Sequence, residues 1–375
     1  MTEYLDMSAS TPVLPEVAEA VAHHFLVEFG NAGSRTHSYG AQAKKAVEYA
    51  RQQVANIVCA EKSGVIFTSG ATESNNLAIL GLRSYASEQK KRHVITTSIE
   101  HKAVLEPMSV LEKEGFEVTY LPVDESGVVS AVELSKALRE DTVLVSVMHV
   151  NNETGSMQPI EALCDVLHGH DAYFHVDAAQ SFGKISGSLV NERIDMMSVS
   201  GHKMYAPMGI GALILRKRGF MRVPLTPLMY GGGQERGLRP GTLPVPLIVG
   251  LGVACEHCLS KASQWQDHAN SLKQALVAAL DGLGAEYNGE QTSPYILNFS
   301  VPGVNSEAAM VALKDIVAVS NGSACTSSSY TPSHVLLAMG LSEERTAGAI
   351  RVSWGPMTKT LPVEAIVNKL STLKI

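Results

Sequence analysis

Short apolar runs rich in β-branched residues alternate with helix-length amphipathic segments through the middle of the chain. The runs expected to be strands are residues 65–68, 93–96, 117–120, 142–147, 173–176 and 212–215. Near-continuous apolar strands separated by helices are typical of a mainly parallel sheet that is covered on both faces. The sequence therefore predicts an α/β fold built on a large, mainly parallel sheet.

The sequence pattern changes after residue 230. A glycine-rich loop at 231–237 leads into a long helical stretch. Within it Leu272, Leu276 and Leu280 recur at i+4, which predicts one buried helix face, and glycines follow at its end. Fewer elements are expected after this helix, among them a strand at 296–300.

The length of 375 residues suggests two domains, since a domain usually holds roughly 100–200 residues. The 45% of hydrophobic residues supports a sizeable buried core. We expect the boundary near residue 260, inside the long helix. The predicted domains are a large one at 13–259 and a smaller α+β domain formed by 1–12 and 260–375.

Charge and hydropathy restrict the classes of partner. Lys and Arg number 30 against 37 Asp and Glu, a net charge of −7, and no basic cluster is long enough to follow a phosphate backbone. The acidic start at 1–6 is not a signal peptide. The longest apolar stretch, 244–255, is interrupted by Pro and Gly and is shorter than the about 20 residues of a membrane span. We expect a soluble cytoplasmic protein that binds neither nucleic acid nor a membrane directly.

Two polar residues follow apolar runs in a way that favours pyridoxal 5′-phosphate (PLP) chemistry. Asp177 comes at the end of the run 173–176, and Lys203 follows a shorter apolar segment. PLP enzymes need a Lys for the Schiff base and an acidic group beside the pyridine nitrogen. The carboxyl ends of strands are also where open α/β sheets bind ligands. Either residue alone would be read as structural, but together they favour a cofactor site.

The segment 68–76 follows a strand and opens a helix with small residues. Free N–H groups and the positive end of the helix dipole suit a phosphate there. An ordinary N-cap at Ser69 or Thr72 explains the same residues almost as well.

The cysteines fall into two groups. Cys325 lies in a Gly- and Ser-rich loop, where a thiol can act as a nucleophile, and Thr331 and Pro332 are expected to start the helix that follows. Cys59 and Cys164 are expected to be buried and inert. The pair Cys255 and Cys258 has zinc-like spacing without a second pair, so we expect packing residues and no metal site.

Seven strings, in order, carry a resemblance to a known family. They are TSGATESNN at 68–76, EHK at 100–102, HVNNETG at 149–155, HVDAAQ at 175–180, SGHK at 200–203, RPGT at 239–242 and GSACTS at 322–327. With them the sequence resembles the cysteine desulfurases of the NifS/IscS type, group I, which are PLP enzymes related to the class V aminotransferases. The resemblance implies the PLP-dependent transferase fold of type I.

The resemblance also implies the roles of site residues. PLP would form its Schiff base with Lys203, with Asp177 at the pyridinium nitrogen, Gln180 at the ring hydroxyl and His101 stacked on the ring as an acid/base. The residues implied in phosphate binding are Ala71, Thr72, Ser200 and His202, with Thr242 from the second subunit of a homodimer. Asn152 and Arg351 would bind the substrate carboxylate region, for which a guanidinium is suited.

The implied reaction converts L-cysteine to L-alanine and leaves the sulfur as a persulfide on Cys325, for delivery to an acceptor protein. Iron–sulfur cluster assembly, tRNA thiolation and DNA phosphorothioation are the pathways that such acceptors serve. The segment 30–37, GNAGSRTH, resembles that of the specialised DndA-like desulfurases of DNA phosphorothioation.

Two classes of alternative stay open at this point. One is another class V PLP enzyme, such as a selenocysteine lyase or an aminotransferase; Cys325 separates them, because transamination needs no thiol. The other is a non-enzymatic sulfur-relay adaptor, which the joint presence of Lys203, Asp177, His101 and Arg351 disfavours.

Overall fold

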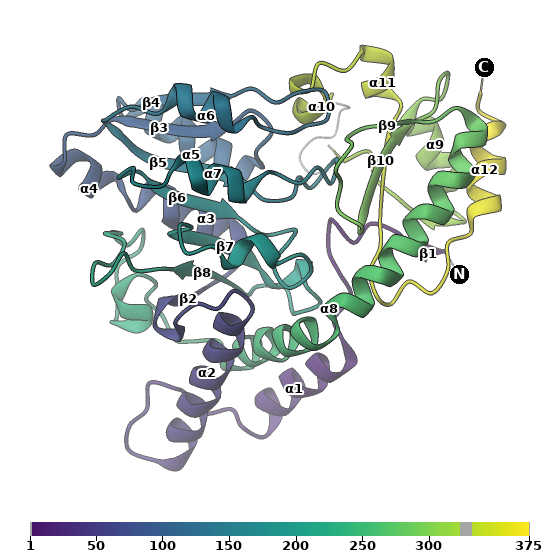
Figure 1. Cartoon of the computed structure of the whole chain (residues 1–375). Helices are drawn as coiled ribbons and strands as arrows, with labels where there is room; N and C mark the ends of the chain where they lie inside the picture. The colour runs from purple at the N-terminus through teal and green to yellow at the C-terminus, as the bar shows by residue number, and fades with distance from the viewer. Residues whose placement is uncertain (1, 323–331, 375) are drawn as a thin grey trace.

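A seven-stranded sheet forms the centre of the computed structural model, which describes residues 2–322 and 332–374 (Figure 1). Only β8 runs antiparallel to its neighbours, and the other strands are parallel. In sheet order the strands are β2 (Val65–Thr68), β8 (Gly211–Leu215), β7 (Met196–Ser200), β6 (Tyr173–Asp177), β5 (Thr142–Met148), β3 (His93–Thr97) and β4 (Glu117–Leu121). The predicted α/β fold class is confirmed.

All six strands expected in this sheet are present, each within one residue of the predicted bounds. The prediction missed β7, whose five residues are all buried. Its sequence, MMSVS, has one β-branched residue, so its strand conformation depends on pairing with β6 and β8 on either side.

Helices cover both faces of the sheet. Ile66 and Phe67 are consecutive in β2 and pack into different apolar cores, as the alternation of side chains along a strand requires. The core around Ile66 includes side chains of α3 and α5, and the core around Phe67 includes those of α1, α2, α7 and α8. The helices of this part are α1 (Pro15–Leu26), α2 (Ser38–Asn56), α3 (Ala71–Leu80), α4 (Arg83–Glu88), α5 (Lys102–Lys113), α6 (Ala131–Ala137) and α7 (Ile160–Val166).

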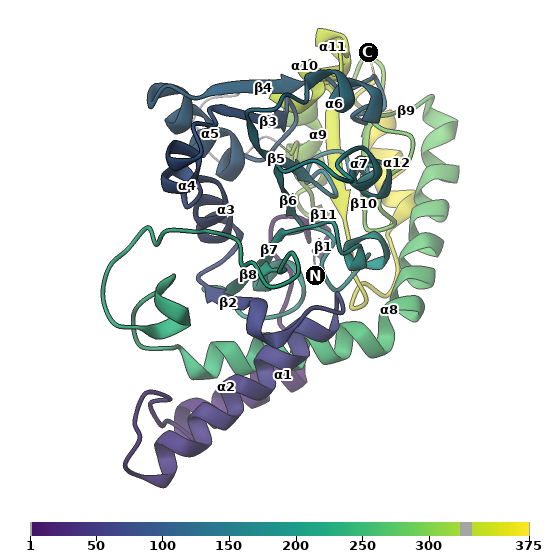
Figure 2. The ribbon, with the colours of Figure 1, turned by 60° about the vertical axis from the view of Figure 1, so that its left-hand side comes forward.

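The long helix α8 (Val245–Leu280) connects the two parts of the molecule (Figures 1 and 2). Leu272, Leu276 and Leu280 are buried, as their spacing predicted. By length and hydropathy alone α8 could cross a bilayer, but its apolar side chains pack on α1, α2 and the second part of the chain. Such packing is typical of a core helix.

The helix α8 contributes to two apolar cores. Its residues up to Trp265 pack into the first core, and those from Ala269 onward pack into a second, smaller one. It covers the sheet β12-β10-β9, and β1 pairs with β11 beside it. The elements here are β1 (Glu3–Tyr4), β9 (Glu286–Tyr287), β10 (Ile296–Ser300), α9 (Ser306–Leu313), β11 (Val317–Ala318), α10 (His334–Ala338), α11 (Glu343–Ala347), β12 (Ala349–Ser353) and α12 (Val363–Ser371). On these pairings we propose the division into 13–259 and 1–12 with 260–375.

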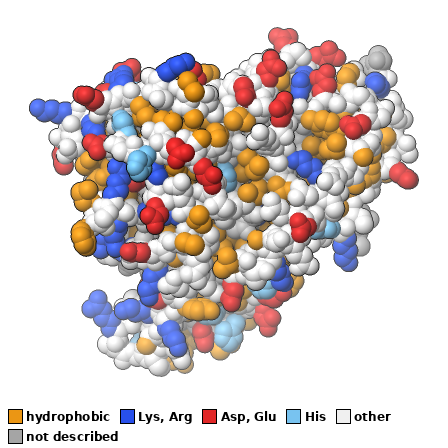
Figure 3. Space-filling model, viewed as in Figure 1, with side chains coloured by type: hydrophobic (Ala, Val, Ile, Leu, Met, Phe, Trp, Pro, Cys, Tyr) orange, Lys and Arg blue, Asp and Glu red, His pale blue; other side chains and the backbone are white. Residues whose placement is uncertain are grey.

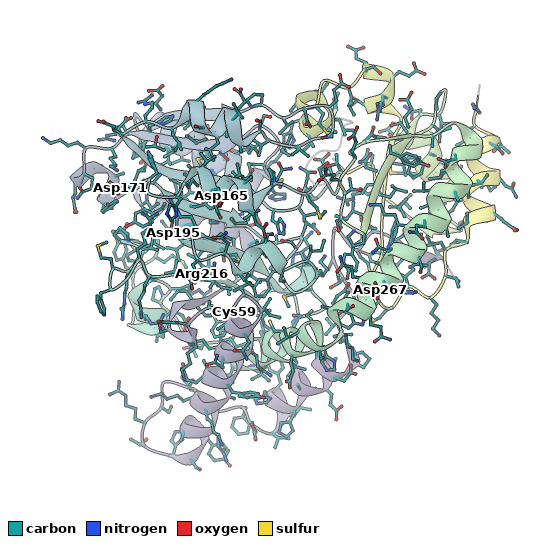
Figure 4. The ribbon with its side chains drawn as sticks, viewed as in Figure 1. Cys59, Asp165, Asp171, Asp195, Arg216 and Asp267 are labelled. Carbon is teal, nitrogen blue, oxygen red and sulfur yellow. The ribbon has the colours of Figure 1, made fainter. Side chains whose placement is uncertain are left out.

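Two local expectations were wrong. The helix after the predicted Cys325 loop is capped by Ser333, whose side chain accepts a hydrogen bond from the amide of Leu336, rather than by Thr331. Cys59 is exposed, because it follows α2 in a left-handed conformation (φ 52°) where the chain turns towards β2 (Figure 4). Cys164, Cys255 and Cys258 are buried as expected, and burial raises the pKa of Cys164 and of Cys258 to about 12.

Asp195 sits at the amino end of β7 and is the centre of a buried ion cluster (Figure 4). Its carboxylate accepts hydrogen bonds from Arg193, from Arg218 and from the amide of Phe174 at 2.6–2.7 Å. Buried polar groups are usually paired in this way. The cluster lies at the amino end of β7.

Acidic and basic side chains are interspersed on the face shown in Figure 3. This distribution agrees with the mildly acidic composition of the chain.

Candidate active site

A cavity of about 580 Å³ lies at the carboxyl ends of the parallel strands. Ten of the residues predicted for the site line it: Ala71, Thr72, His101, Asn152, Asp177, Gln180, Ser200, His202, Lys203 and Arg351. Nine of them lie at the ends of parallel strands or follow them, at one edge of the large sheet. Arg351 comes from β12 (Ala349–Ser353) in the second part of the chain. Of the other two, Thr242 is exposed and does not line the cavity, and Cys325 lies outside the described residues.

Asp177 is the last residue of β6 and is 5% exposed. Its Oδ2 accepts a 2.7 Å hydrogen bond from Nδ2 of Asn75, and its Oδ1 accepts one of 3.0 Å from the amide of Ala179. These two hydrogen bonds fix the orientation of the Asp177 carboxylate at the wall of the cavity.

Lys203 follows β7 in a short 3-10 turn and reaches the N-terminal segment of the chain. Its Nζ donates to the carbonyl oxygen of Ser8 and, at 2.9 Å, to that of Ala9. Gln180 contacts the same segment, since its Nε2 donates to the Ser8 carbonyl at 2.9 Å. Residues 8–10 line the cavity as well, which the sequence did not predict.

The amino end of α3 faces the cavity and carries no side-chain cap. Its N-cap is Gly70, so the alternative of an ordinary cap at Ser69 or Thr72 is not supported. Gly211 of β8 packs against Gly70, where an added Cβ would lie 2.6 Å from the Gly70 Cα. The first-turn amides and the hydroxyls of Thr72 and Ser200 form a cradle of the type that binds phosphate.

His101 caps α5, with Nδ1 accepting a 3.0 Å hydrogen bond from the amide of Ala103. His101 is exposed at the cavity, but the protein around the ring removes part of its hydration and so lowers its pKa. The neutral ring therefore carries its proton on Nε2, because Nδ1 acts as an acceptor. His202 is also held neutral: burial and the nearby Lys203 lower its pKa to about 4.

Arg351 lies on β12 and is 3% exposed. One terminal nitrogen donates to the carbonyl oxygen of Asn152 at 2.8 Å, and the other to Oδ1 of Asp6 at 2.6 Å. Asn152 thus contacts the arginine through its backbone. Sequence reasoning did not identify Asp6, because 345 positions separate the two partners.

Glu153 lies beside Gly322 and Ser333, which are on either side of the segment that holds Cys325. Its Oε2 accepts a 2.5 Å hydrogen bond from Ser333, and an added Cβ at Gly322 would lie 3.3 Å from the same oxygen. Glu153 follows Asn152 directly, so residues 322 and 333 both lie near the arginine end of the cavity.

Glu100 is a buried carboxyl beside the site, fully enclosed behind His101. Its Oε1 accepts hydrogen bonds from Thr97 (2.6 Å) and from the amide of Met148 (2.9 Å). Burial raises its pKa to about 8, so it is neutral near pH 7.

The residues of the cavity fit PLP. Three buried oxygens on it have no hydrogen-bond partner within the described residues: Oγ of Ser8, Oδ1 of Asn75 and Oε1 of Gln180. Buried polar atoms are rarely left unpaired, so these atoms indicate a polar ligand. A lysine, a fixed carboxylate and an uncapped helix start match the amine-reactive carbonyl, the ring nitrogen and the phosphate of that cofactor.

Comparisons with known proteins agree with this chemistry. The model of the class V aminotransferase family matches residues 3–366. The cysteine desulfurase IscS of Rickettsia peacockii (strain Rustic) is 46% identical over 369 residues, which cover 97% of this chain and 89% of the relative. The chain belongs to the cysteine desulfurase family. Enzymes of this family depend on PLP.

Two solved structures share this fold over nearly the whole chain. A NifS-like protein superposes with a TM-score of 0.90 at 37% identity, covering 100% of this chain and 98% of its own. The crystal structure of DndA from Streptomyces lividans gives a TM-score of 0.83 at 50% identity, with 94% and 99% covered. The predicted family is thereby confirmed.

Proposed function

We propose that the chain converts L-cysteine to L-alanine and transfers the sulfur to an acceptor protein, with Lys203, His101 and Cys325 as its catalytic residues. The observation that carries the proposal is the single cavity that brings together Lys203, Asp177, His101 and Arg351. Selenocysteine lyase activity is the second candidate, supported by the same cavity. It differs in needing no thiol on the enzyme.

Lys203 would hold PLP covalently and afterwards move the Cα proton of the substrate. When bound, PLP supplies an electron sink for the negative charge that develops at Cα. Asp177, fixed by Asn75 and the Ala179 amide, would keep the pyridine nitrogen protonated. The first turn of α3 with Thr72, Ser200 and His202 would hold the phosphate.

The substrate would be oriented by Arg351, whose guanidinium can grip a carboxylate with parallel hydrogen bonds. Asn152 holds that guanidinium through its carbonyl oxygen. His101 would donate the proton on Nε2 and take it back in the course of the reaction.

Cys325 would attack the substrate sulfur as a thiolate. An S–S bond forms as the substrate C–S bond breaks, and protonation of the remaining carbon skeleton gives L-alanine. The products balance as one L-alanine and one enzyme persulfide per L-cysteine and thiol. Covalent capture divides a difficult transfer into two easier steps.

A homodimer would complete the cavity with Thr242 of the second subunit, because Thr242 of the same chain is exposed and does not line it. The 50% identity with DndA and the segment 30–37 favour DNA phosphorothioation among the possible sulfur pathways. The acceptor protein would then make the contact with DNA.

The test is the release of L-alanine from L-cysteine by the purified PLP-loaded protein with a reducing thiol. Multiple turnovers are expected, together with a persulfide that labels Cys325. Alanine formation at the parent rate by Cys325→Ala would contradict the nucleophile and favour the lyase, which should then act on selenocysteine.

A further inference from the structure

Arg351 is held from two sides before any substrate binds. Its terminal nitrogens donate to Asn152 (2.8 Å) and to Asp6 (2.6 Å), while its buried Nε has no hydrogen-bond partner among the described residues. A guanidinium has five N–H donors, so hydrogens for a substrate carboxylate are left.

Asp6 reaches the arginine from outside the cavity. Arg351 lines the cavity, whereas Asp6 does not. The Asp6 backbone is fixed by a bridge to Ser353 of β12 and by its carbonyl oxygen, which accepts a 3.0 Å hydrogen bond from the Tyr4 hydroxyl. In the described part of the chain, Arg351 is the cation that pairs with Asp6. A substrate carboxylate can therefore bind beside Asp6 without displacing it.

The carboxylate of Asp6 changes the net charge beside which a ligand binds. The positive charge of Arg351 and the negative charge of Asp6 cancel. Because the arginine is only 3% exposed, water screens charges beside it weakly. One substrate carboxylate then leaves the cluster with a single negative charge. A second acidic group would add another within the same poorly screened cavity, where like charges repel strongly.

We propose that Asp6 is a specificity-determining residue, because its carboxylate neutralises Arg351. Amino acids with one acidic group then bind, and those with an acidic side chain are disfavoured. The inference rests on the proposed role of Arg351 in binding the substrate carboxylate. Under this proposal dicarboxylic amino acids are disfavoured by charge, and no steric barrier is required.

The test compares L-asparagine with L-aspartate, two ligands of nearly equal size that differ in side-chain charge. Their dissociation constants are measured by calorimetry on the PLP-loaded protein, so that the result does not depend on turnover. Asp6→Asn keeps an acceptor for Arg351 and removes the charge. It should tighten binding of L-aspartate relative to L-asparagine by about fivefold or more.

An unchanged ratio of the two constants in Asp6→Asn, and in Asp6→Ser as a second variant, would overturn the proposal. Glu3→Gln is the matched control, since it removes a negative charge from the same segment at a residue that does not line the cavity, and its ratio should equal the parent's. Arg351→Gln tests the underlying role separately. It should weaken both ligands, and unchanged binding there would contradict the role of Arg351 itself.

Discussion

Nδ2 of Asn75 donates a 2.7 Å hydrogen bond to Oδ2 of Asp177, and both side chains are buried. The bond crosses from α3, which begins at the proposed phosphate cradle, to the end of β6. It therefore fixes the distance between the phosphate end and the pyridine end of the proposed cofactor site.

Asn75→Ala is expected to weaken PLP binding about tenfold, because one hydrogen bond to a charged group contributes about 1.5 kcal/mol or more. Asp177→Asn should lower the turnover number about 100-fold or more, since the charge beside the ring is lost. PLP titration followed by absorbance measures the cofactor affinity of Asn75→Ala. The rate of alanine release measures the turnover number of Asp177→Asn. Asn368→Ala, exposed on α12, is the control and should match the parent. Parent-like PLP affinity in Asn75→Ala would rule out this role.

Cys325→Ala should keep bound PLP and its yellow colour and form no persulfide. Cys59→Ala is the matched control, because Cys59 is an exposed free thiol that does not line the cavity. It should form the persulfide at the parent rate, because Cys59 does not contact the site. Trapping the persulfide with an alkylating reagent, followed by peptide mass spectrometry, distinguishes the two thiols. A persulfide on Cys59 in the parent would contradict the assignment.

Mixing two inactive variants tests the shared site. Lys203→Ala lacks the attachment residue, and Thr242→Ala lacks the proposed contribution to the partner's phosphate cradle. In a mixed dimer one cavity has both native residues, so equal mixing after subunit exchange should restore about one quarter of the parent activity. Activity no higher than the average of the separate variants would show that Thr242 does not act across a subunit interface.

Glu100→Gln should change how stability depends on pH. Burial raises the pKa of Glu100 to about 8 from a usual 4.5, so the folded protein keeps a proton that the unfolded chain releases between these values. Rising pH then favours unfolding, by at most about 1.4 kcal/mol per pH unit from this group. The glutamine side chain cannot titrate, and its amide group has nearly the same shape as a protonated carboxyl group.

Urea unfolding at pH 5, 6, 7 and 8 measures this prediction. The free energy of unfolding of Glu100→Gln should approach the parent's at pH 5 and exceed it increasingly towards pH 8. Glu106→Gln, exposed on α5, should follow the parent throughout. A difference that does not vary with pH would show that Glu100 stays ionised in the folded protein.

Much of the fold was predictable because the strands of a parallel sheet are marked by local composition. The strand β7 escaped because its residues 196–200 are extended only through pairing with β6 and β8. Cys59 was expected to be buried from the usual behaviour of cysteine, yet the polar segment after it, 60–64, turns the chain at the surface.

The candidate site was predictable where its residues lie in motifs, such as Lys203 and Asp177. It was not predictable where the contact depends on tertiary structure. Ser8 and Ala9 accept hydrogen bonds from Lys203 across more than half of the chain, and no local pattern indicates that. Asn75 lies inside the recognised string at 68–76, so its role could have been found by asking which polar side chain of α3 faces β6.

The ion pair between Asp6 and Arg351 also sets the order in which the protein can be completed during its synthesis. All strands of the large sheet lie before residue 216, so that sheet can form while the rest of the chain is still being translated. Asp6 is translated 345 positions before its partner. The Arg351 end of the cavity is therefore complete only after β12 has been translated.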